Sequence, residues 1–463
     1  MDSTITYVGI WYIDEADNMA PGILSMDLSA GRYTLEFSKR IQKNQVANGF
    51  SEGERTIPKL YGLANTGEHI TLIDCFLLKQ RKYNDEIVSC TFYVETVLVG
   101  YHFTSQKLEF NCFEFDMPEI VAWSDLCNFS LSIKSRSEQP LRFSYDWIEK
   151  EHAIFQIGNN LVVSFIPFSK KLSLSVSDSE YSLTQSIIVR FSYSTPVTLE
   201  KLWTDFREFL LIINLGIQSN LNRNQVVCYS CNICKMDSRG LITAYSARPQ
   251  TISAKTTFLD YLFSLSELIE DDLVLCNWLE KKDDLNPIMN LYFASVMNPN
   301  LPLDVLFLNL VQALEIYHTR FRSQDKDRYK KRIERLLNAC PKSQRQFHEK
   351  YLMPKSSKDE GITLLNRLSD LFICDFDIEF EKLDNKVFPY SFVDDIVNTR
   401  NYLTHYNKKK QASALSYSDI LYSLLCLQTV LEYYILRELG FPQKVLSKAL
   451  KKRNTEIGRQ IRN

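Results

Sequence analysis

The sequence predicts an α+β protein of several domains, in which an antiparallel β-sandwich or barrel-like domain comes first and an α-helical bundle follows. Three observations lead to this prediction. The length of 463 residues suggests two or three domains. Up to about residue 195, short runs of alternating apolar and polar residues are separated by turn signals. From about residue 256 onward, apolar residues recur three and four positions apart, which is the period of an amphipathic helix.

The first predicted domain, residues 1–195, is rich in strands. Every second residue is apolar in 171–177, which is the clearest alternation in the chain. Many short strands with frequent turns favour an antiparallel sandwich or barrel over an α/β sheet. Shorter runs of the same kind occur at 70–73, 91–94, 129–133 and 161–165.

Residues 196–255 form a predicted bridging segment of one helix and one hairpin. Apolar residues at helical spacing over 199–213 predict the helix, which we expect to end near Gly216. A hairpin is expected next, with 226–229 as one strand and 241–245 as the other.

The third predicted domain, residues 256–463, is helical. Its last well-formed helix carries clear end signals, because Ser418 can cap its start and Gly440 can stop it. The helices that we predict with the clearest period are 303–321, 329–337, 361–372, 391–406 and 418–439.

Charge is divided unevenly along the chain. The formal net charge is −2, but residues 1–196 hold 17 basic and 24 acidic side chains, whereas the remainder holds 37 and 32. The basic part of the chain is compatible with nucleic-acid binding, although such an excess is also common on ordinary solvated surfaces. Basic runs occur at 320–335, at 408–410 and in the tail that follows Phe441.

The sequence also indicates a compartment. The first twenty residues lack the basic and apolar regions of a signal peptide, and no run of 18 apolar residues predicts a membrane span. Eleven cysteines are scattered without the spacing of a disulfide framework. We therefore expect a cytoplasmic protein with free thiols and no membrane partner.

Motifs for several common chemistries are missing from the sequence. There is no Walker A motif, no Gly-x-Gly-x-x-Gly, no Gly-x-Ser-x-Gly and no His-Glu-x-x-His. His69, His102 and His152 are isolated in the sequence from any nucleophile or ligand partner. An ATPase, a dinucleotide enzyme, an α/β-hydrolase and a zincin are all disfavoured, and we expect no cofactor.

Zinc is considered only at Cys228, Cys231 and Cys234. Three cysteines within seven residues can ligate zinc, but a tetrahedral site needs a fourth ligand, and the next cysteine is Cys276. Free thiols in a hairpin are the favoured interpretation, and any zinc here would be structural. We predict no metal in a catalytic site.

The most informative stretch is residues 400–405, Arg-Asn-Tyr-Leu-Thr-His, on the helix predicted over 391–406. Arg400 falls on the apolar stripe of this helix, where a charge is costly unless it is paired or used. Glu315, on a helix that is apolar on nearly every side, is the expected partner. An Arg and a His at this spacing can bind a phosphate and move a proton, with Asn401 to orient either group.

One helix does not aim both groups at the same phosphate. Five residues at about 100° each separate Arg400 and His405 by about 140° around the helix axis. A bent helix end or a second copy of the chain would complete such a site. The competing interpretation is a structural Arg400 held by Glu315, with His405 on the surface.

These residues resemble a known family. Val-Gln-Ala-Leu-Glu at 311–315 and the Arg-x4-His stretch at 400–405 resemble the HEPN domains of ApeA-type proteins. Gly-Ile-Trp-Tyr at 9–12, Gly-Ile-Leu at 22–24 and the run 61–72 resemble the ApeA N-terminal domain. The resemblance covers nearly the whole chain and implies that the C-terminal part is a HEPN bundle.

The resemblance implies an antiviral, abortive-infection endoribonuclease that cuts RNA, with tRNA as a candidate, after a phage-encoded trigger activates it. It implies metal-independent attack by the ribose 2′-OH, a site built from Arg400, Asn401 and His405 with Glu315 in support, and a homodimer or higher homo-oligomer. Lys408, Lys409 and Lys410 are expected to bind RNA, because they follow His405 closely. The alternative is a catalytically inactive HEPN-like scaffold in a defence or toxin–antitoxin system.

Overall fold

The structure is a computed structural model in which two compact units can be separated, Met1–Leu259 and Asp260–Asn463. We call them the N-terminal unit and the C-terminal unit and describe each by itself. The residues that the structure describes are 4–13, 19–37, 56–83, 86–103, 108–126, 129–134, 142–147, 153–175, 180–229, 241–249, 261–270, 273–296, 298, 300–354, 361–372, 390–406 and 411–460.

The N-terminal unit begins with strands that close into a barrel. The strand order is β6-β3-β2-β1-β4-β5, and β5 also pairs with β6, so the sheet returns to its first strand. Every one of these pairings is antiparallel. Closure removes the free edges that an open sheet would present. The strands are β1 (Thr4–Tyr12), β2 (Ala20–Asp27), β3 (Arg32–Phe37), β4 (Thr56–Ala64), β5 (His69–Tyr83) and β6 (Glu86–Val99).

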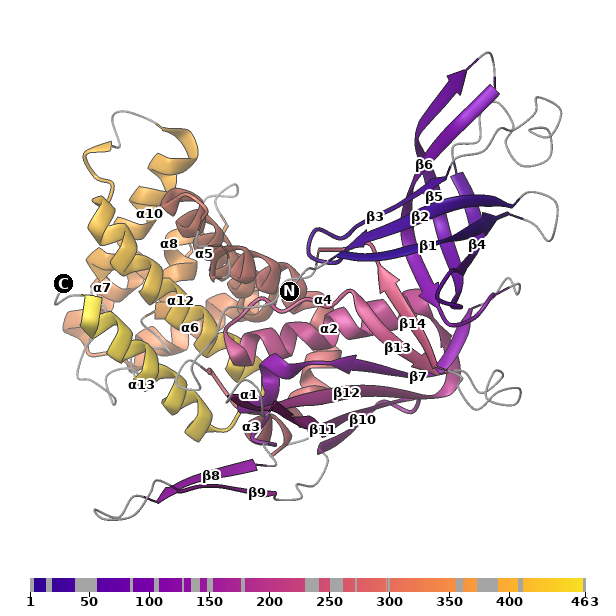
Figure 1. The fold of residues 1–463 in the computed structure, drawn as a ribbon. Helices are drawn as coiled ribbons and strands as arrows, with labels where there is room; N and C mark the ends of the chain where they lie inside the picture. Colours follow the sequence, from indigo (N-terminus) through magenta and orange to yellow (C-terminus); the bar gives the residue numbers. More distant parts are fainter. Residues whose placement is uncertain are drawn as a thin grey trace. The chain divides into compact units, whose positions relative to one another are not determined.

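The barrel continues into an open antiparallel sheet through β6, which both share (Figure 1). Residues 90–93 of β6 pair with β3, whereas 96–99 of the same strand pair with β14. From β14 the sheet continues in the order β13-β7-β12-β11-β10. Its strands are β7 (Glu109–Asp116), β10 (Ala153–Ile157), β11 (Leu161–Ser175), β12 (Glu180–Thr198), β13 (Gln225–Tyr229) and β14 (Leu241–Ser246).

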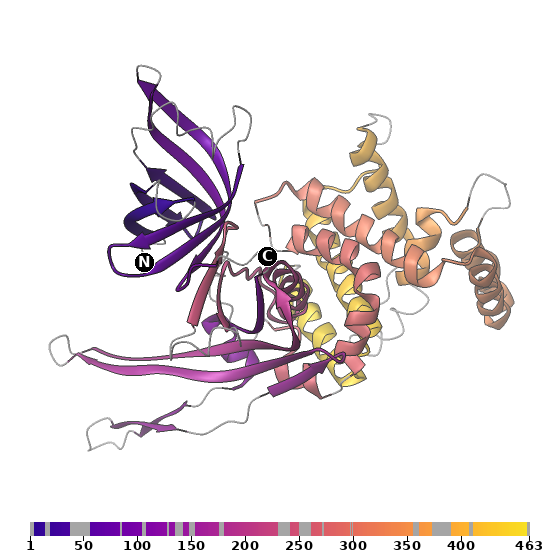
Figure 2. The same ribbon diagram turned by 90° about the vertical axis from the view of Figure 1, so that its right-hand side faces the viewer.

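Two conclusions follow from this topology. The prediction of an antiparallel barrel-like domain before a helical domain is confirmed. The predicted strand 161–165 and the described residues 171–175 of the predicted strand 171–177 are parts of one long strand, β11, whose pairing with β12 has an irregularity between Lys170 and Ser173. Figure 2 shows β11 and β12 as the long paired strands of this sheet. A separate hairpin is formed by β8 (Phe129–Lys134) and β9 (Arg142–Trp147).

A tryptophan and a glycine explain part of the N-terminal sequence pattern. Trp11 on β1 is 1% exposed and pairs in register with Gly62 on β4. A Cβ atom at Gly62 would lie 2.3 Å from the Trp11 ring, so only glycine leaves room for the indole. The patterns at 9–12 and 61–72 therefore describe parts of three neighbouring strands, β1, β4 and β5, and one close contact between β1 and β4.

The helix α2 (Leu199–Ile217) covers the open sheet of the N-terminal unit (Figure 1). Phe206 of α2 stacks on Phe115 of β7 with ring centroids 3.6 Å apart. Thr198 caps the helix by accepting the Lys201 backbone N–H, and Gln218 ends it in the left-handed region. The expected bridging segment 196–255 is thus built largely from α2 and from β13 and β14, which belong to the N-terminal unit. Two short helices, η2 (Pro118–Ile120) and α1 (Val121–Ser124), follow β7.

The C-terminal unit is helical in its described residues, as predicted (Figures 1 and 2). The central helix is α12, which packs against α4, α5 and α13 and has most of its residues buried. The helices are α3 (Leu265–Ile269), α4 (Leu273–Val296), α5 (Leu303–Tyr317), the π-helical turn η4 (His318–Arg322), α6 (Lys326–Ala339), α7 (Lys342–Leu352), α8 (Leu364–Ser369), α10 (Tyr390–His405), α12 (Tyr417–Leu439) and α13 (Gln443–Gln460).

A buried ion pair joins three of these helices. Glu432 of α12 is 2% exposed, and its carboxylate accepts hydrogen bonds from Arg453 of α13 at 2.6 and 2.7 Å. Tyr292 of α4 and Gln428 of α12 donate to the same carboxylate at 2.6 and 2.8 Å. A buried charge needs this degree of satisfaction, because its desolvation is costly. The contact with Arg453 holds the pKa of Glu432 below its ordinary value against the opposing effect of burial.

The ends of α12 correct one prediction and confirm another. The N-cap is Ser416, whose hydroxyl accepts the Asp419 backbone N–H, so the predicted cap at Ser418 is wrong by two residues. Serine is a favoured N-cap residue, so the sequence allows either Ser416 or Ser418 to cap the helix. Their hydroxyls lie 3.0 Å apart. At the other end, Gly440 adopts the left-handed conformation with φ of 85°, as expected for a helix stop.

The length and apolarity of α12 are sufficient for a membrane span. Within the helical unit, however, 72% of the apolar window is buried. Such burial is the property of a core helix in a globular bundle.

Candidate active site

The helix α10 carries the Arg400–His405 stretch. Its apolar stripe is buried, with Val393 and Ile396 fully covered and Leu403 6% exposed. The structure gives α10 the bounds Tyr390–His405, which agree within one residue with the helix predicted over 391–406. Thr399 is also buried, and its hydroxyl accepts the Leu415 backbone N–H at 2.9 Å. These contacts fix the rotation of α10 and hence the direction in which Arg400 leaves it.

Arg400 lies beside Glu315 of α5. The Nη2 atom of Arg400 is 3.9 Å from Oε2 of Glu315, and the two side chains are 34% and 33% exposed. Nη1 of Arg400 lies 3.4 Å from Oδ1 of Asn401, which can accept its hydrogen bond. The carbonyl of Arg400 accepts a hydrogen bond from Thr404 at 2.7 Å. The guanidinium is therefore loosely paired and keeps access to solvent.

His405 is the last residue of α10, and its side chain is exposed. The next residue, Tyr406, has a positive φ of 46°, and its N–H donates to the Tyr402 carbonyl at 2.6 Å. This left-handed residue ends the helix. The structure thus brings together Arg400, Asn401 and Glu315, whereas His405 reaches solvent one turn further along the same helix.

Some predicted residues lie outside the described part of the chain. Lys408, Lys409 and Lys410 are among them, and so are Cys231, Cys234 and His152. Cys228 is described and is fully buried, and burial raises the pKa of its thiol well above the ordinary value. Among the described residues, no group of three or more His, Cys, Asp or Glu side chains is arranged to hold a metal ion.

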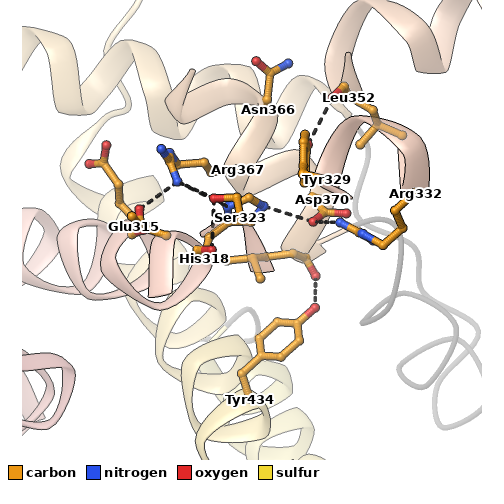
Figure 3. Close-up of polar contacts among 12 residues, drawn as sticks. Glu315, His318, Ser323, Tyr329, Arg332, Leu352, Asn366, Arg367, Asp370 and Tyr434 are labelled. Carbon is orange, nitrogen blue, oxygen red and sulfur yellow. Dashed lines mark hydrogen bonds and ion pairs between the residues drawn. The ribbon is translucent and has the colours of Figure 1, made fainter. Parts of the chain in front are cut away.

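A buried polar network that the sequence motifs do not reveal lies next to Glu315 (Figure 3). His318 is 0% exposed, and its Nε2 lies 3.0 Å from Oδ2 of Asp370. Nη1 of Arg367 donates to the Ser323 hydroxyl at 2.9 Å and to Thr319 at 2.7 Å, and it lies 3.4 Å from Nδ1 of His318. A histidine three residues after Glu315, at the end of an apolar helix, was the only signal in the sequence.

The charge states of this network follow from burial and pairing. Burial lowers the pKa of His318 from 6.5, an effect that outweighs the opposing influence of Asp370. Hydrogen bonding to His318 and the charge of Arg332 hold the pKa of Asp370 below its ordinary value despite burial. A neutral imidazole therefore donates from Nε2 to an ionised Asp370, and its Nδ1 is an acceptor.

Ser323, His318 and Asp370 have the connectivity of a nucleophilic triad, but not the accessibility. The Ser323 hydroxyl lies 3.0 Å from Nδ1 of His318 and is 6% exposed, while Asp370 is 3% exposed. The same hydroxyl also receives an N–H from Arg367. A substrate cannot reach a serine in this position, so the network holds Arg367 in place rather than forming a nucleophile.

His69 and His102 are not isolated in the fold. Their rings form an edge-to-face pair with centroids 4.5 Å apart in the N-terminal unit. Nε2 of His102 lies 2.8 Å from the Gly62 carbonyl, and Nδ1 lies 3.2 Å from the Tyr12 hydroxyl. Burial lowers the pKa of His102, which favours a neutral ring that packs between strands.

The comparisons with known proteins divide the chain in a similar way. A family model described as ApeA N-terminal domain 1 matches residues 6–278, which is more than half of the chain. The chain belongs to this ApeA family. A second model, described as Apea-like HEPN, matches residues 308–445 of the ApeA-like chain and includes both Glu315 and the stretch 400–405. No curated protein and no solved structure gave a match.

The predicted resemblance to ApeA-type proteins is therefore confirmed for both parts of the chain. An ApeA-type HEPN domain suggests a nuclease that acts in defence, because HEPN domains are generally ribonucleases. The matches concern families and leave the roles of Arg400, Asn401, His405 and Glu315 as predictions.

Proposed function

We propose that this ApeA-like protein is a metal-independent endoribonuclease of antiphage defence, and that α10 carries its catalytic groups. The observation that carries the proposal is the geometry of one helix. Arg400, which is partly exposed, and His405, which is exposed, lie within six residues inside an Apea-like HEPN domain. Both can therefore meet a nucleic acid that approaches α10.

The proposed reaction uses the nucleophile that RNA itself carries. His405, as a neutral imidazole, takes the proton of a ribose 2′-OH, whose oxygen then attacks the adjacent phosphorus. The bond from phosphorus to the 5′ oxygen breaks, and the imidazolium returns a proton to that leaving oxygen. Arg400 neutralises the charge that develops on the non-bridging oxygens. The products are a 2′,3′-cyclic phosphate and a 5′-OH.

Asn401 and Glu315 would position the arginine. Asn401 Oδ1 lies next to Nη1 of Arg400, and Glu315 lies near Nη2, so the two acceptors limit how the guanidinium can turn. A planar guanidinium held in one orientation can present two N–H groups to one phosphate. The 3.9 Å separation from Glu315 leaves this pairing weak enough for a phosphate to compete with it.

We further propose that two copies of the chain complete the site. Arg400 and His405 diverge by about 140° around α10 because of the helix period. His405 of one copy and Arg400 of a second copy can face the same phosphate across a two-fold axis. In this proposal the protein acts in the cytoplasm on RNA, with tRNA as a candidate. A phage component activates it through the N-terminal unit, and Lys408, Lys409 and Lys410 bind the RNA backbone.

The test is cleavage of total RNA by the purified full chain, with and without EDTA, followed by mapping of the ends. Cleavage that survives EDTA and leaves 2′,3′-cyclic phosphates supports the proposal. Intact RNA at every protein concentration, including in extracts of infected cells, would exclude a nuclease. Loss of cleavage in EDTA would exclude the metal-independent mechanism.

An inactive scaffold is the second candidate, and the contact between Arg400 and Glu315 favours it. In a scaffold, the pair would only join α10 to α5. Arg400→Gln would then loosen the C-terminal unit, and His405→Ala would change nothing that can be measured. If the protein is a nuclease, His405→Ala should abolish RNA cleavage, and Arg400→Gln should have little effect on stability. Both variants should therefore be compared for RNA cleavage and for unfolding.

A further inference from the structure

A cavity of about 310 Å³ lies in the C-terminal unit between η4 and α6. Three arginines line it: Arg322 at the end of η4, and Arg328 and Arg332 one turn apart on α6. Phe321 and Tyr329 add aromatic surface to its wall. This volume is at the lower end of the range for sites that bind small organic ligands.

Two of the three guanidinium groups are held in place by neighbouring aromatic rings. Arg322 lies over the ring of Tyr434, 5.5 Å from its centroid, and Arg332 lies over Tyr329 at 5.4 Å. Arg332 also forms an ion pair with the buried Asp370 (Figure 3). Contacts on the ring face and on one edge hold an arginine side chain in a fixed orientation.

Arg328 differs from the other two arginines. Its side chain is exposed, and within the described part of the chain its guanidinium has no ion-pair partner. Asp325 is the acidic residue among the described residues that line the cavity, and it caps α6 by accepting the backbone N–H groups of Asp327 and Arg328. Its charge therefore lies against the positive end of the helix dipole. Arg332 is paired with Asp370, and Arg328 contributes a positive charge to the cavity that neither acid pairs with among the described contacts.

We propose that this cavity is a binding site for the phosphate of a nucleotide. Three arginines around one space match the charge and the multiple acceptor oxygens of a phosphate group. The remaining volume and the aromatic wall suit the sugar and base that accompany it. The nucleotide is either free in solution or a unit of a nucleic-acid strand, and the phosphate chemistry is the same. The proposal stands independently of RNA cleavage at α10.

The binding is measured with the full chain by isothermal titration calorimetry. AMP represents a free nucleotide, and adenosine is its control without phosphate. A short single strand with 2′-deoxyribose represents a nucleic acid that the proposed nuclease cannot cut. We expect AMP, the strand or both to bind, adenosine not to bind, and inorganic phosphate to compete. Binding of AMP alone identifies a free nucleotide, and binding of the strand alone identifies a strand phosphate.

Matched variants locate the site. Arg328→Gln removes one charge from the cavity and should weaken binding roughly tenfold or more, as expected for a charge-assisted hydrogen bond. Lys330→Gln removes one charge from an exposed position about 200° away around α6, and it should change affinity less than about twofold. Arg400→Gln should bind the same ligand with unchanged affinity, because Arg400 does not line the cavity. This expectation does not depend on whether the protein cleaves RNA.

Three results would overturn the proposal. The first is that adenosine binds as tightly as AMP. The second is that Lys330→Gln and Arg328→Gln weaken ligand binding equally. The third is that neither AMP nor the strand binds. Circular dichroism of each variant shows whether α6 remains folded. If Arg328→Gln is not folded, Arg328→Lys, which keeps the charge but not the fork of N–H groups, takes its place with the same expected loss.

Discussion

Arg400 of α10 and Glu315 of α5 lie 3.9 Å apart, and each side chain remains about one-third exposed. A contact of this length between partly solvated groups provides little stability, because water screens the charges. The arrangement positions a cation beside an acid without burying it. In a catalytic site, that is the state in which a substrate phosphate can exchange places with the carboxylate.

The first prediction concerns the stability that this pair provides. Glu315→Gln should lower the free energy of unfolding by no more than about 1 kcal/mol, as is usual for an exposed ion pair. Chemical denaturation of the full chain, monitored on the helical signal, measures the difference. A loss of several kcal/mol would mean that Arg400 is a structural partner, in agreement with the scaffold.

The second prediction concerns His405. His405→Ala should abolish RNA cleavage while leaving the unfolding transition unchanged, because the side chain is exposed at the end of α10. His348→Ala, which removes another histidine of the C-terminal unit from α7, is the control and should cut RNA normally. Equal activity of the two variants would remove His405 from the mechanism.

The third prediction concerns the buried pair of Glu432 and Arg453. Arg453→Met should destabilise the C-terminal unit by about 3–5 kcal/mol, because it leaves a carboxylate buried without its counter-charge. Lys448→Met, also on α13, breaks a partly exposed pair with Glu267 of α3 and should cost about 1 kcal/mol or less. Denaturant titrations of the two variants test the difference. Similar losses would show that water reaches Glu432.

The fourth prediction concerns pH. The pKa of His318 is lowered in the folded chain, so the unfolded chain binds more protons as the pH falls below 6.5. The stability that comes from the neutral imidazole is therefore present above pH 6.5 and is lost below it. The His318→Gln variant should be less stable than the unsubstituted chain at pH 7.5. Its stability against unfolding should, however, fall less between pH 7.5 and pH 5.5.

The control for this pH effect is His348→Gln, which removes a histidine of α7 and leaves His318 in place. Thermal unfolding at the two pH values, in buffers of equal ionic strength, gives the comparison. If the unfolding temperature of His318→Gln falls between the two pH values by as much as that of the unsubstituted chain, another group causes the acid sensitivity. The depressed pKa of Asp370 acts in the same direction but at lower pH, since its carboxylate must be protonated before its contribution is lost.

The sequence by itself determined the features that depend on neighbouring residues. Alternation marked the strands, the helical period placed α5, α10 and α12 within a few residues, and Gly440 marked the end of α12. The motif at 400–405 also needs no fold to be recognised. The caps were less certain, because Ser416 and Ser418 satisfy the same local rule and only the folded turn selects between them.

Tertiary structure decided what depends on residues far apart in the chain. The barrel requires β6 to pair with β3, a strand about 60 residues earlier, and the open sheet requires β6 to pair with β14, a strand about 150 residues later. The network that joins His318 to Asp370 and Arg367 spans about 50 residues, and no local period records it. The reason is physical. Periodicity reports which face of an element is buried, whereas the partner of a buried polar group is fixed only when the elements pack.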